Sequence, residues 1–371
     1  MKKALFILVL SSIIGLATPS ISYSDYSIIQ LTHNAYRDLY PQINNNEYVV
    51  WYGRDGPREI FLYDGTGITQ LTDNPYNDWF PQINDNGYVV WYGIDGLDED
   101  ADGEIFLYDG VATTQITNNS YFDSFPQIND NGYVVWERVD PDDGGGIFLY
   151  DGTGIINISK NSYGEDDPQI NNNGYVVWCR WDGLDEEIFL YDGVETRRLT
   201  DNSYNDEHPQ INDNGYVVWA GGGEIFLYDG TGTINISKNS SFDEDYPQIN
   251  NNGYVVWHGW DGLDEEIFLY DGTGIIQITD NSYPDLDPQI NENGYIVWEG
   301  HDGSDSEIFL YDGTGIIQIT ANSYDDWSPQ INDNGYVVWH GWDGSDWEIF
   351  LAFRSDGLEP QLYGSGGGGG G

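Results

Sequence analysis

The chain has 371 residues and a formal net charge of −51, because 63 Asp and Glu residues outnumber 12 Lys and Arg. Such an acidic surface repels phosphate backbones and anionic lipid headgroups, which excludes nucleic-acid binding and favours cations or basic partners. Aromatic residues make up 15% of the chain. The chain therefore has the apolar material for a packed core, and disorder does not explain its acidity.

Residues 1–22 have the features of an export signal. Lys2 and Lys3 precede a mostly apolar run over 4–16, and small residues follow up to Ser22. The apolar run is too short for a comfortable transmembrane helix, so we expect no integral membrane segment in the mature chain. The protein is predicted to be exported to the periplasm, the cell surface or the medium. Cys179 is the only cysteine, which excludes an intrachain disulfide.

One unit, PQIN-x-N-x-Y-[VI]-V-W, recurs eight times from residue 41 onward. Its proline stands at Pro41, Pro81, Pro126, Pro168, Pro209, Pro247, Pro288 and Pro329. A period of about 40 residues with several short strands per unit is typical of a propeller or a solenoid. Each unit then cannot bury its own apolar faces and must stack on its neighbours.

The repeat over residues 288–320 contains four candidate strands. They are the PQI segment at 288–290 and the runs 295–298, 307–311 and 316–320, separated by turns rich in Asn, Asp and Gly. The middle two runs are continuously apolar, which indicates that both faces of the sheet are covered. A propeller blade lies between two other blades in this way. We therefore predict an all-β, eight-bladed β-propeller of four-stranded antiparallel blades.

The two ends of the repeat array predict how the ring closes. Residues 27–32 resemble the fourth strand of a repeat, whereas the eighth unit loses the pattern after residue 352. We expect the N-terminal strand to complete the last blade; the alternative is closure from within by residues 358–363. The predicted organisation is a signal peptide (1–22), a propeller (27–352) and a C-terminal tail with a Gly-rich linker (353–371).

The units resemble the TolB-like, WD-like β-propeller repeat of exported bacterial proteins. In the last unit the pattern is carried by Asp326, Pro329, Asn334-Gly335, the strand 336–339, Asp343-Gly344 and Glu348-Ile349, after the closing Ile319-Thr320 of the preceding unit. The resemblance covers residues 27–352 and implies the fold. TolB carries an additional α/β domain and propeller peptidases carry a hydrolase domain. This chain has no room for either, so the resemblance implies no partner contacts.

An acidic residue precedes each PQI segment by three positions. The series is Asp38, Asp78, Asp123, Glu165, Asp206, Glu244, Asp285 and Asp326. We expect these residues in the connections between blades, around the channel mouth on one face. They could form a ring that attracts a cation or a basic peptide, or each could accept backbone N–H bonds and hold its loop. Their presence in every unit favours the structural role, because a binding site usually breaks the symmetry.

The longest loop between strands, 95–104, resembles a calcium-binding loop. Asp98, Asp100 and Asp102 alternate before Gly103, so that their carboxylates could converge on one hard cation. The absence of flanking helical patterns excludes an EF-hand. Calcium is the only cofactor that the sequence suggests, and the alternative for this loop is a solvated acidic hairpin.

Six tryptophans lie outside the repeated strand positions, and three of them lie in the same hairpin of different units. Trp181, Trp260 and Trp342 are each followed by Asp-Gly. An exposed indole beside carboxylates could stack on a sugar ring, or it could cover the edge of its own blade.

No catalytic residue is predicted, since the chain contains neither G-x-S-x-G nor H-E-x-x-H. The sequence favours an exported, monomeric binding or scaffold module for an unidentified protein or carbohydrate ligand. Two alternatives stay open. One is a polysaccharide-acting lyase or hydrolase with its site at the channel mouth, and the other is a structural component of the cell surface.

Overall fold

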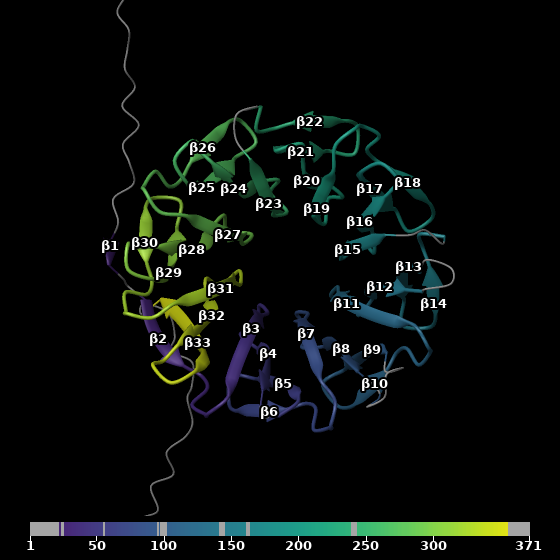
Figure 1. Ribbon diagram of the computed structural model, residues 1–371, viewed down its shortest axis with the longest axis horizontal. Coiled ribbons are helices and arrows are strands. Elements are labelled where there is room, and N and C mark those ends of the chain that lie inside the picture. Colours follow the sequence, from purple (N-terminus) through teal and green to yellow (C-terminus); the bar gives the residue numbers. More distant parts are fainter. Residues whose placement is uncertain are drawn as a thin grey trace, which may run out of the picture.

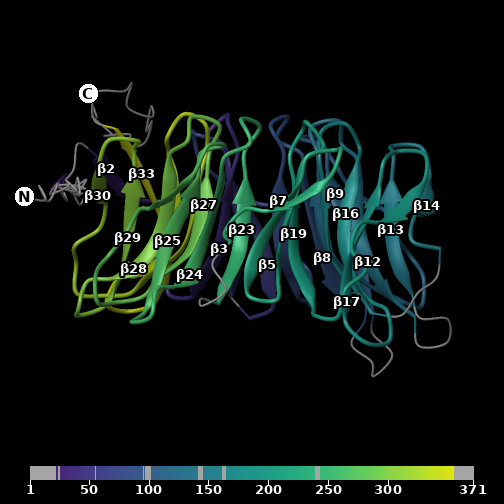
Figure 2. The ribbon, with the colours of Figure 1, turned by 90° about the horizontal axis from the view of Figure 1, so that it is seen from above.

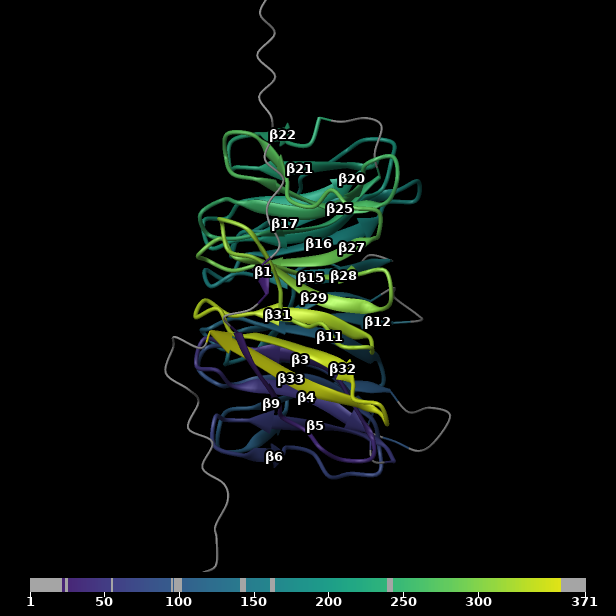
Figure 3. The same cartoon turned by 90° about the vertical axis from the view of Figure 1, so that its left-hand side faces the viewer.

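A computed structural model describes residues 22–23, 26–54, 56–94, 96, 102–140, 145–160, 164–238 and 243–354. Eight four-stranded antiparallel sheets surround a central axis, which confirms the predicted eight-bladed propeller (Figure 1). Seen edge-on, the ring is a disc whose strands run between its two faces (Figures 2 and 3). Within the described ranges, no helix is long and apolar enough to cross a lipid bilayer.

The first strand of each blade lies nearest the axis and the second strand packs outside it (Figure 1). The first strands are β3 (Arg37–Ile43), β7 (Asp78–Ile83), β11 (Phe122–Ile128), β15 (Glu165–Ile170), β19 (Asp206–Ile211), β23 (Glu244–Ile249), β27 (Asp285–Ile290) and β31 (Asp326–Ile331). The second strands are β4 (Val49–Arg54), β8 (Val89–Ile94), β12 (Val134–Val139), β16 (Val176–Trp181), β20 (Val217–Gly221), β24 (Val255–Trp260), β28 (Ile296–His301) and β32 (Val337–Trp342).

The third and fourth strands complete each blade toward the rim. The third strands are β5 (Arg58–Tyr63), β9 (Gly103–Tyr108), β13 (Gly146–Tyr150), β17 (Glu186–Tyr191), β21 (Glu224–Tyr228), β25 (Glu265–Tyr270), β29 (Ser306–Tyr311) and β33 (Trp347–Arg354). The fourth strands are β6 (Ile68–Gln70), β10 (Thr113–Gln115), β14 (Ile155–Asn157), β18 (Thr196–Arg198), β22 (Thr233–Asn235), β26 (Ile275–Gln277), β30 (Ile316–Gln318) and β2 (Tyr26–Gln30). A further short strand, β1 (Ser22–Tyr23), runs parallel to β30.

Alternate residues of the continuous apolar strands pack against opposite neighbours. In the first blade, Val49 and Trp51 join a cluster that includes Val338 of the last blade. Val50 packs on the other side, in a cluster with Trp91 of the second blade. All of these residues are at most 1% exposed. The two-sided burial explains why the strands lack an alternation of apolar and polar residues.

The N-terminal strand closes the ring, as predicted. β2 pairs antiparallel with β33, from Tyr26 opposite Arg354 to Gln30 opposite Phe350. On its other edge β33 pairs with β32. Both edges of β33 are therefore occupied, which excludes the alternative closure by residues 358–363; those residues lie outside the described part of the chain.

The turn between the first and second strands carries an unanticipated set of bonds. The first asparagine of each N-x-N motif accepts two backbone N–H groups of its own turn; Asn44 accepts those of Asn46 at 3.0 Å and Tyr48 at 2.9 Å. Its side-chain amide donates to the backbone oxygen of the equivalent asparagine in the next blade. The series is Asn44, Asn84, Asn129, Asn171, Asn212, Asn250, Asn291, Asn332 and back to Asn44, with distances of 2.8–3.0 Å.

Two further circles of bonds follow the same turns, and we call this side of the disc the Asn face. The second asparagine of the motif also donates across to the next blade, as from Asn214 to the oxygen of Asn251 at 2.6 Å. The backbone N–H between the two asparagines bonds to the next side chain, as from Asp213 to Asn251 at 2.7 Å. A central cavity of about 360 Å³ lies here, lined by the Ile-Asn pair and the following residue of all eight blades.

The buried asparagine circle should dominate the stability of the Asn face. In Asn212→Ala, the N–H groups of Asn214 and Tyr216 lose their acceptor. The oxygen of Asn250 loses one of its two donors and keeps the N–H of Gly253. Each buried group without a partner costs about 1–3 kcal/mol, so we expect a loss of at least about 2 kcal/mol in urea denaturation. The control Asn214→Ala removes an exposed bond and should cost less than about 1 kcal/mol. Equal losses for the two variants would contradict this assignment.

Candidate functional site

The predicted acidic series lies at the opposite side of the disc, which we call the hairpin face because the hairpins between second and third strands lie there. The structure places these residues at the start of the first strands rather than in the connecting loops, as with Asp38 in β3. Their side chains are buried, with exposures of 0–8%. A buried carboxylate presents little charge to a ligand, so the geometry favours the structural role.

For the six aspartates of the series, side chains rather than backbone N–H groups supply the indole and amide hydrogen bonds described next. In the six blades with aspartate, one oxygen accepts the indole N–H of the second-strand Trp, as from Trp219 to Asp206 at 3.0 Å. The other oxygen accepts an asparagine amide four residues earlier, as from Asn202 at 2.5 Å. The N–H of Asn202 in turn bonds to Glu187 of the preceding blade at 3.0 Å. A polar chain Glu–Asn–Asp–Trp thus joins neighbouring blades.

The glycine two residues after the strand Trp makes room for this carboxylate. A Cβ added at Gly221 would lie 2.1 Å from the Oδ1 of Asp206, and the equivalent distance at Gly341 is also 2.1 Å, to Asp326. In two blades an arginine stands at this position instead. Arg138 binds both oxygens of Asp123 at 2.7 and 2.9 Å, and Arg180 lies 3.8 Å from Glu165.

The predicted tryptophans lie on the same face, at the ends of second strands. Trp181 and Trp260 are 45% and 39% exposed, so both indoles are accessible. Trp342 contacts Trp347 edge-on, with 5.8 Å between ring centroids. It lines a cavity of about 410 Å³ between the last blade and the loop that precedes it, together with Tyr324 and Asp343.

The predicted calcium loop belongs to the hairpin between β8 and β9. Asp98 and Asp100 lie outside the described residues, and Asp102 directly precedes β9. The geometry of this trio is therefore not defined, and calcium binding there stays a prediction.

The blades also differ at the residue before each proline, which the sequence reasoning did not single out. This residue has a positive φ of 47–55° in every blade. It sits in a bulge where the register between first and second strands shifts, as between Leu39 and Gln42. A non-glycine residue in this conformation costs about 1–3 kcal/mol and persists where the surroundings impose it. We call these residues the pre-proline ring: Tyr40, Phe80, Phe125, Asp167, His208, Tyr246, Asp287 and Ser328.

One half of the pre-proline ring is aromatic. Ring centroids are 5.7 Å apart between Tyr40 and Phe80 and 5.5 Å between Phe80 and Phe125. Tyr40 and Phe125 are 44% and 46% exposed. Behind them, Tyr52 stacks on Tyr40 at 5.7 Å and Tyr92 stacks on Phe80 at 6.1 Å. Side chains of three consecutive blades therefore form a continuous apolar arc with accessible ring faces.

The other half is ionisable. His208 Nδ1 lies 2.7 Å from the carboxylate of Asp245, and its ring stacks on Tyr246 at 4.1 Å. Burial opposes protonation of His208, but the bond to Asp245 offsets it and raises the pKa of the imidazole. The N–H of Asp287 donates to His258 at 3.3 Å, and burial lowers the pKa of that histidine. Asp167 lies close enough for its charge to act on His208.

Two glutamates of the second strands add to this half. Burial raises the pKa of Glu137 and of Glu299 to about 7. Cys179 donates to Asp166 at 2.7 Å, and burial raises the pKa of its thiol well above the usual range. Such a thiol stays protonated and is a poor nucleophile. The described geometry therefore shows a place that could bind a ligand rather than an activated nucleophile.

Comparison with known proteins shows the fold alone. No family model and no curated protein match the chain. The propeller domain of the trilobed protease from Pyrococcus furiosus has a TM-score of 0.57 at 13% identity, over 78% of this chain and 99% of that one. An oligogalacturonate lyase in complex with manganese has a TM-score of 0.55 at 13% identity, over 89% and 98%.

Dipeptidyl peptidase 4 of Porphyromonas gingivalis is also similar, with a TM-score of 0.60 at 12% identity. The alignment covers 86% of this chain and 58% of the peptidase. Identities this low carry no activity across. The eight-bladed propeller fold is confirmed, whereas the resemblance to TolB-like repeats stays a prediction because no family model matches.

The link between Asp206 and Gly221 can be tested by a double-mutant cycle. Asp206→Ala leaves the buried Trp219 indole without its acceptor, so we expect a loss of about 1–3 kcal/mol in chemical denaturation. Gly221→Ala should destabilise the native protein, because its Cβ would meet the Asp206 carboxylate at 2.1 Å. In the Asp206→Ala background that cost should fall by at least about 1 kcal/mol. Additive effects, or a loss below about 0.5 kcal/mol for Asp206→Ala, would rule out this packing.

The buried acids also predict how stability depends on pH. Burial raises the pKa values of Asp38, Asp78, Asp206, Asp285 and Asp326 to about 6. The folded protein then binds more protons than the unfolded chain between about pH 4 and pH 7, so stability falls as pH rises through this window. Denaturation in metal-free buffer should give a higher free energy of unfolding at pH 5 than at pH 8. Asp206→Asn should reduce the difference, and greater stability at pH 8 would refute the prediction.

Proposed function

We propose that the protein is an exported binding module whose ligand contacts the pre-proline ring. The observation that supports this most is the break in symmetry. Eight nearly identical repeats carry five different residue types (Tyr, Phe, Asp, His and Ser) at one strained position, and Tyr40, Phe125 and Tyr246 are 44–46% exposed there. Strained backbone in an otherwise regular structure is common at functional sites. The export signal over residues 1–22 is the reason for placing this function outside the cytoplasm.

The chemistry of the ring favours an amphipathic, cationic ligand. The aromatic arc offers flat faces for an aromatic side chain or a sugar ring, and aromatic residues often carry much of the binding energy at interfaces. The ionisable arc and the net charge of −51 favour a basic group. A segment of a partner protein with Lys or Arg beside an aromatic residue fits both halves. A glycan that contains amino sugars is the carbohydrate with the same chemistry.

Binding can be measured by calorimetry with two probes. The first is a short peptide of alternating Lys and Trp, with a Glu-for-Lys peptide as its negative counterpart. The second is a chitosan oligosaccharide, with its N-acetylated form as counterpart. We expect at least one cationic probe to bind and its counterpart not to bind. Addition of about 0.5 M salt should weaken the interaction, because the Debye length is then only about 4 Å and the charges are screened.

The variants Phe80→Ser and His208→Ser each install the side chain that Ser328 already carries in this conformation, so the fold should tolerate them. Each should weaken binding about tenfold or more. The control Val194→Ser changes an 88% exposed residue of a turn on the Asn face and should leave affinity unchanged. Unchanged affinity in both ring variants, or no binding of either cationic probe, would overturn the proposal. Cleavage of the oligosaccharide would replace it with the alternative of a polysaccharide-acting enzyme.

A further inference from the structure

The hairpin between second and third strands carries a second motif, D-G-x-D-x-E, in four of the eight blades. Its first aspartate directly follows the second strand, its middle aspartate lies in the turn, and its glutamate lies near the start of the third strand. The four trios are Asp182, Asp185 and Glu187; Asp261, Asp264 and Glu266; Asp302, Asp305 and Glu307; and Asp343, Asp346 and Glu348.

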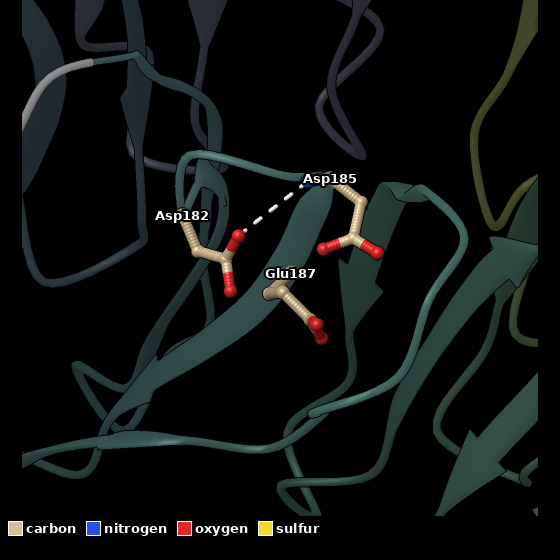
Figure 4. A group of neighbouring side chains, drawn as sticks. All are labelled: Asp182, Asp185 and Glu187. Atoms are coloured by element: carbon tan, nitrogen blue, oxygen red, sulfur yellow. Dashed lines mark hydrogen bonds between the residues drawn. The ribbon is translucent and has the colours of Figure 1, made fainter.

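The turn brings the three carboxylates together. Figure 4 shows the neighbouring side chains of Asp182, Asp185 and Glu187, which lie where β17 begins. One ligand atom from each lies within 4.8 Å of the others, and the same holds for the trios of β29 and β33. In the β25 hairpin the group within that distance is Asp261, Glu266 and Asp280, the last from the loop that follows β26.

Local bonds use only part of each carboxylate. The Oδ1 of Asp182 caps its turn by accepting the N–H of Leu184 at 2.9 Å and that of Asp185 at 3.4 Å (Figure 4). The Oε1 of Glu187 accepts the N–H of Asn202 at 3.0 Å. The first aspartate and the glutamate thus each keep a second oxygen that the turn does not need.

Buried oxygens without a partner occur in all four motifs. They are the Oδ1 atoms of Asp185, Asp264, Asp305 and Asp346 and the Oε2 atoms of Glu187, Glu266, Glu307 and Glu348. The four glutamates are fully buried, and Asp185 and Asp264 are only 6% and 8% exposed. A buried carboxylate oxygen without a hydrogen bond is costly unless a proton or a cation neutralises it. The same atoms in four blades therefore mark a place where a positive charge would be stabilising.

One blade supplies its own cation. The guanidinium of Arg198 lies 3.0 Å from Asp182, 2.5 Å from Glu187 and 3.1 Å from Asp201. Arg198 pairs with Phe189 of β17. In the other three blades, the residue that pairs with the equivalent phenylalanine (Phe268, Phe309 or Phe350) is Gln277, Gln318 or Gln30. In those three blades a neutral glutamine stands where the arginine stands, and no basic side chain forms an ion pair with the trio in the described part of the chain.

We propose that the hairpins at β25, β29 and β33 each bind a calcium ion, and that Arg198 takes the place of this ion in the blade of β17. Carboxylate oxygens are the ligands of hard cations, and calcium binds them at 2.3–2.6 Å in a flexible shell of six to eight oxygens. Oxygens within 4.8 Å of one another can surround such an ion. Magnesium requires about 2.0–2.1 Å and near-octahedral geometry, which three carboxylates of one hairpin supply less well.

These sites are distinct from the pre-proline ring and go beyond the proposed ligand binding. The glutamate of each trio also accepts the N–H that begins the Glu–Asn–Asp–Trp chain, as with Asn322 and Glu307 at 2.8 Å. A bound ion would therefore hold the hairpin of one blade at the point where that blade meets the next.

The test compares calcium stoichiometry among variants, titrated with CaCl2 from metal-free protein. The number of bound calcium ions is compared between variants, because any calcium bound by the hairpin between β8 and β9 is the same in each variant and cancels. The double variant Asp305→Asn/Asp346→Asn should lose two calcium equivalents. The control Asp271→Asn/Asp312→Asn removes the same charge from turn-capping residues of the Asn face and should lose none. Circular dichroism in metal-free buffer checks that each variant is folded.

A second variant tests the opposite direction. Arg198→Gln gives the blade of β17 the glutamine that the other three blades carry at this position. This variant should bind one more calcium ion than the native protein. Calcium should bind at least tenfold more tightly than magnesium. The proposal fails if the double variant keeps the native stoichiometry, if the control loses as much, if Arg198→Gln gains nothing, or if magnesium binds equally well. None of these results depends on whether the pre-proline ring binds its ligand.

Discussion

The circle of buried asparagine amides on the Asn face is the interaction on which the architecture depends. A single side chain closes its own turn through Oδ1 and joins the next blade through Nδ2. In an open array the last amide would have no acceptor, and the first carbonyl would keep only the N–H of its own turn, as Asn44 keeps that of Glu47. The amide is buried, so the loss of its acceptor would cost free energy. The bond from Asn332 to Asn44 exists only in a closed ring, so the circle favours closure as well as packing.

On the hairpin face, neighbouring blades are joined mainly through ionisable side chains rather than through a circle of amides. At six of the eight boundaries a buried glutamate, an asparagine and a buried aspartate lie above the strand Trp. Two kinds of group compensate for the burial of these acids: indole and amide N–H groups that donate to them, and the side chains of Arg138, Arg180 and Arg198. Part of the acidity of the chain thus comes from buried carboxyl groups, whereas the composition alone suggests that all of them lie on the solvated surface.

The repeat predicted the strands, the number of blades and closure by the N-terminal strand, because a period of about 40 residues and continuous apolar runs depend only on local order along the chain. It did not predict that Asn44 and its equivalents bond to the neighbouring blade. Asn in an N-x-N motif reads as a turn former, and the acceptor lies one full repeat away. The predicted acidic series proved to be buried for a similar reason, since the space that Gly221 leaves for Asp206 appears only in three dimensions. The pre-proline ring escaped notice because positive φ in front of proline has no marker in the residue types.

The pairing of β2 with β33 links residues more than 300 positions apart. The first strand to be made is therefore the last to find its partner, and seven blades must stack before the eighth can be assembled from both ends of the chain. Contacts of such sequence separation form slowly, because the intervening loop must be ordered first. The repeats are also nearly interchangeable in sequence, so a strand from a neighbouring chain could occupy the same edge of β33. The order of folding, and the concentration at which it takes place, therefore decide whether the ring closes on itself or on a second molecule.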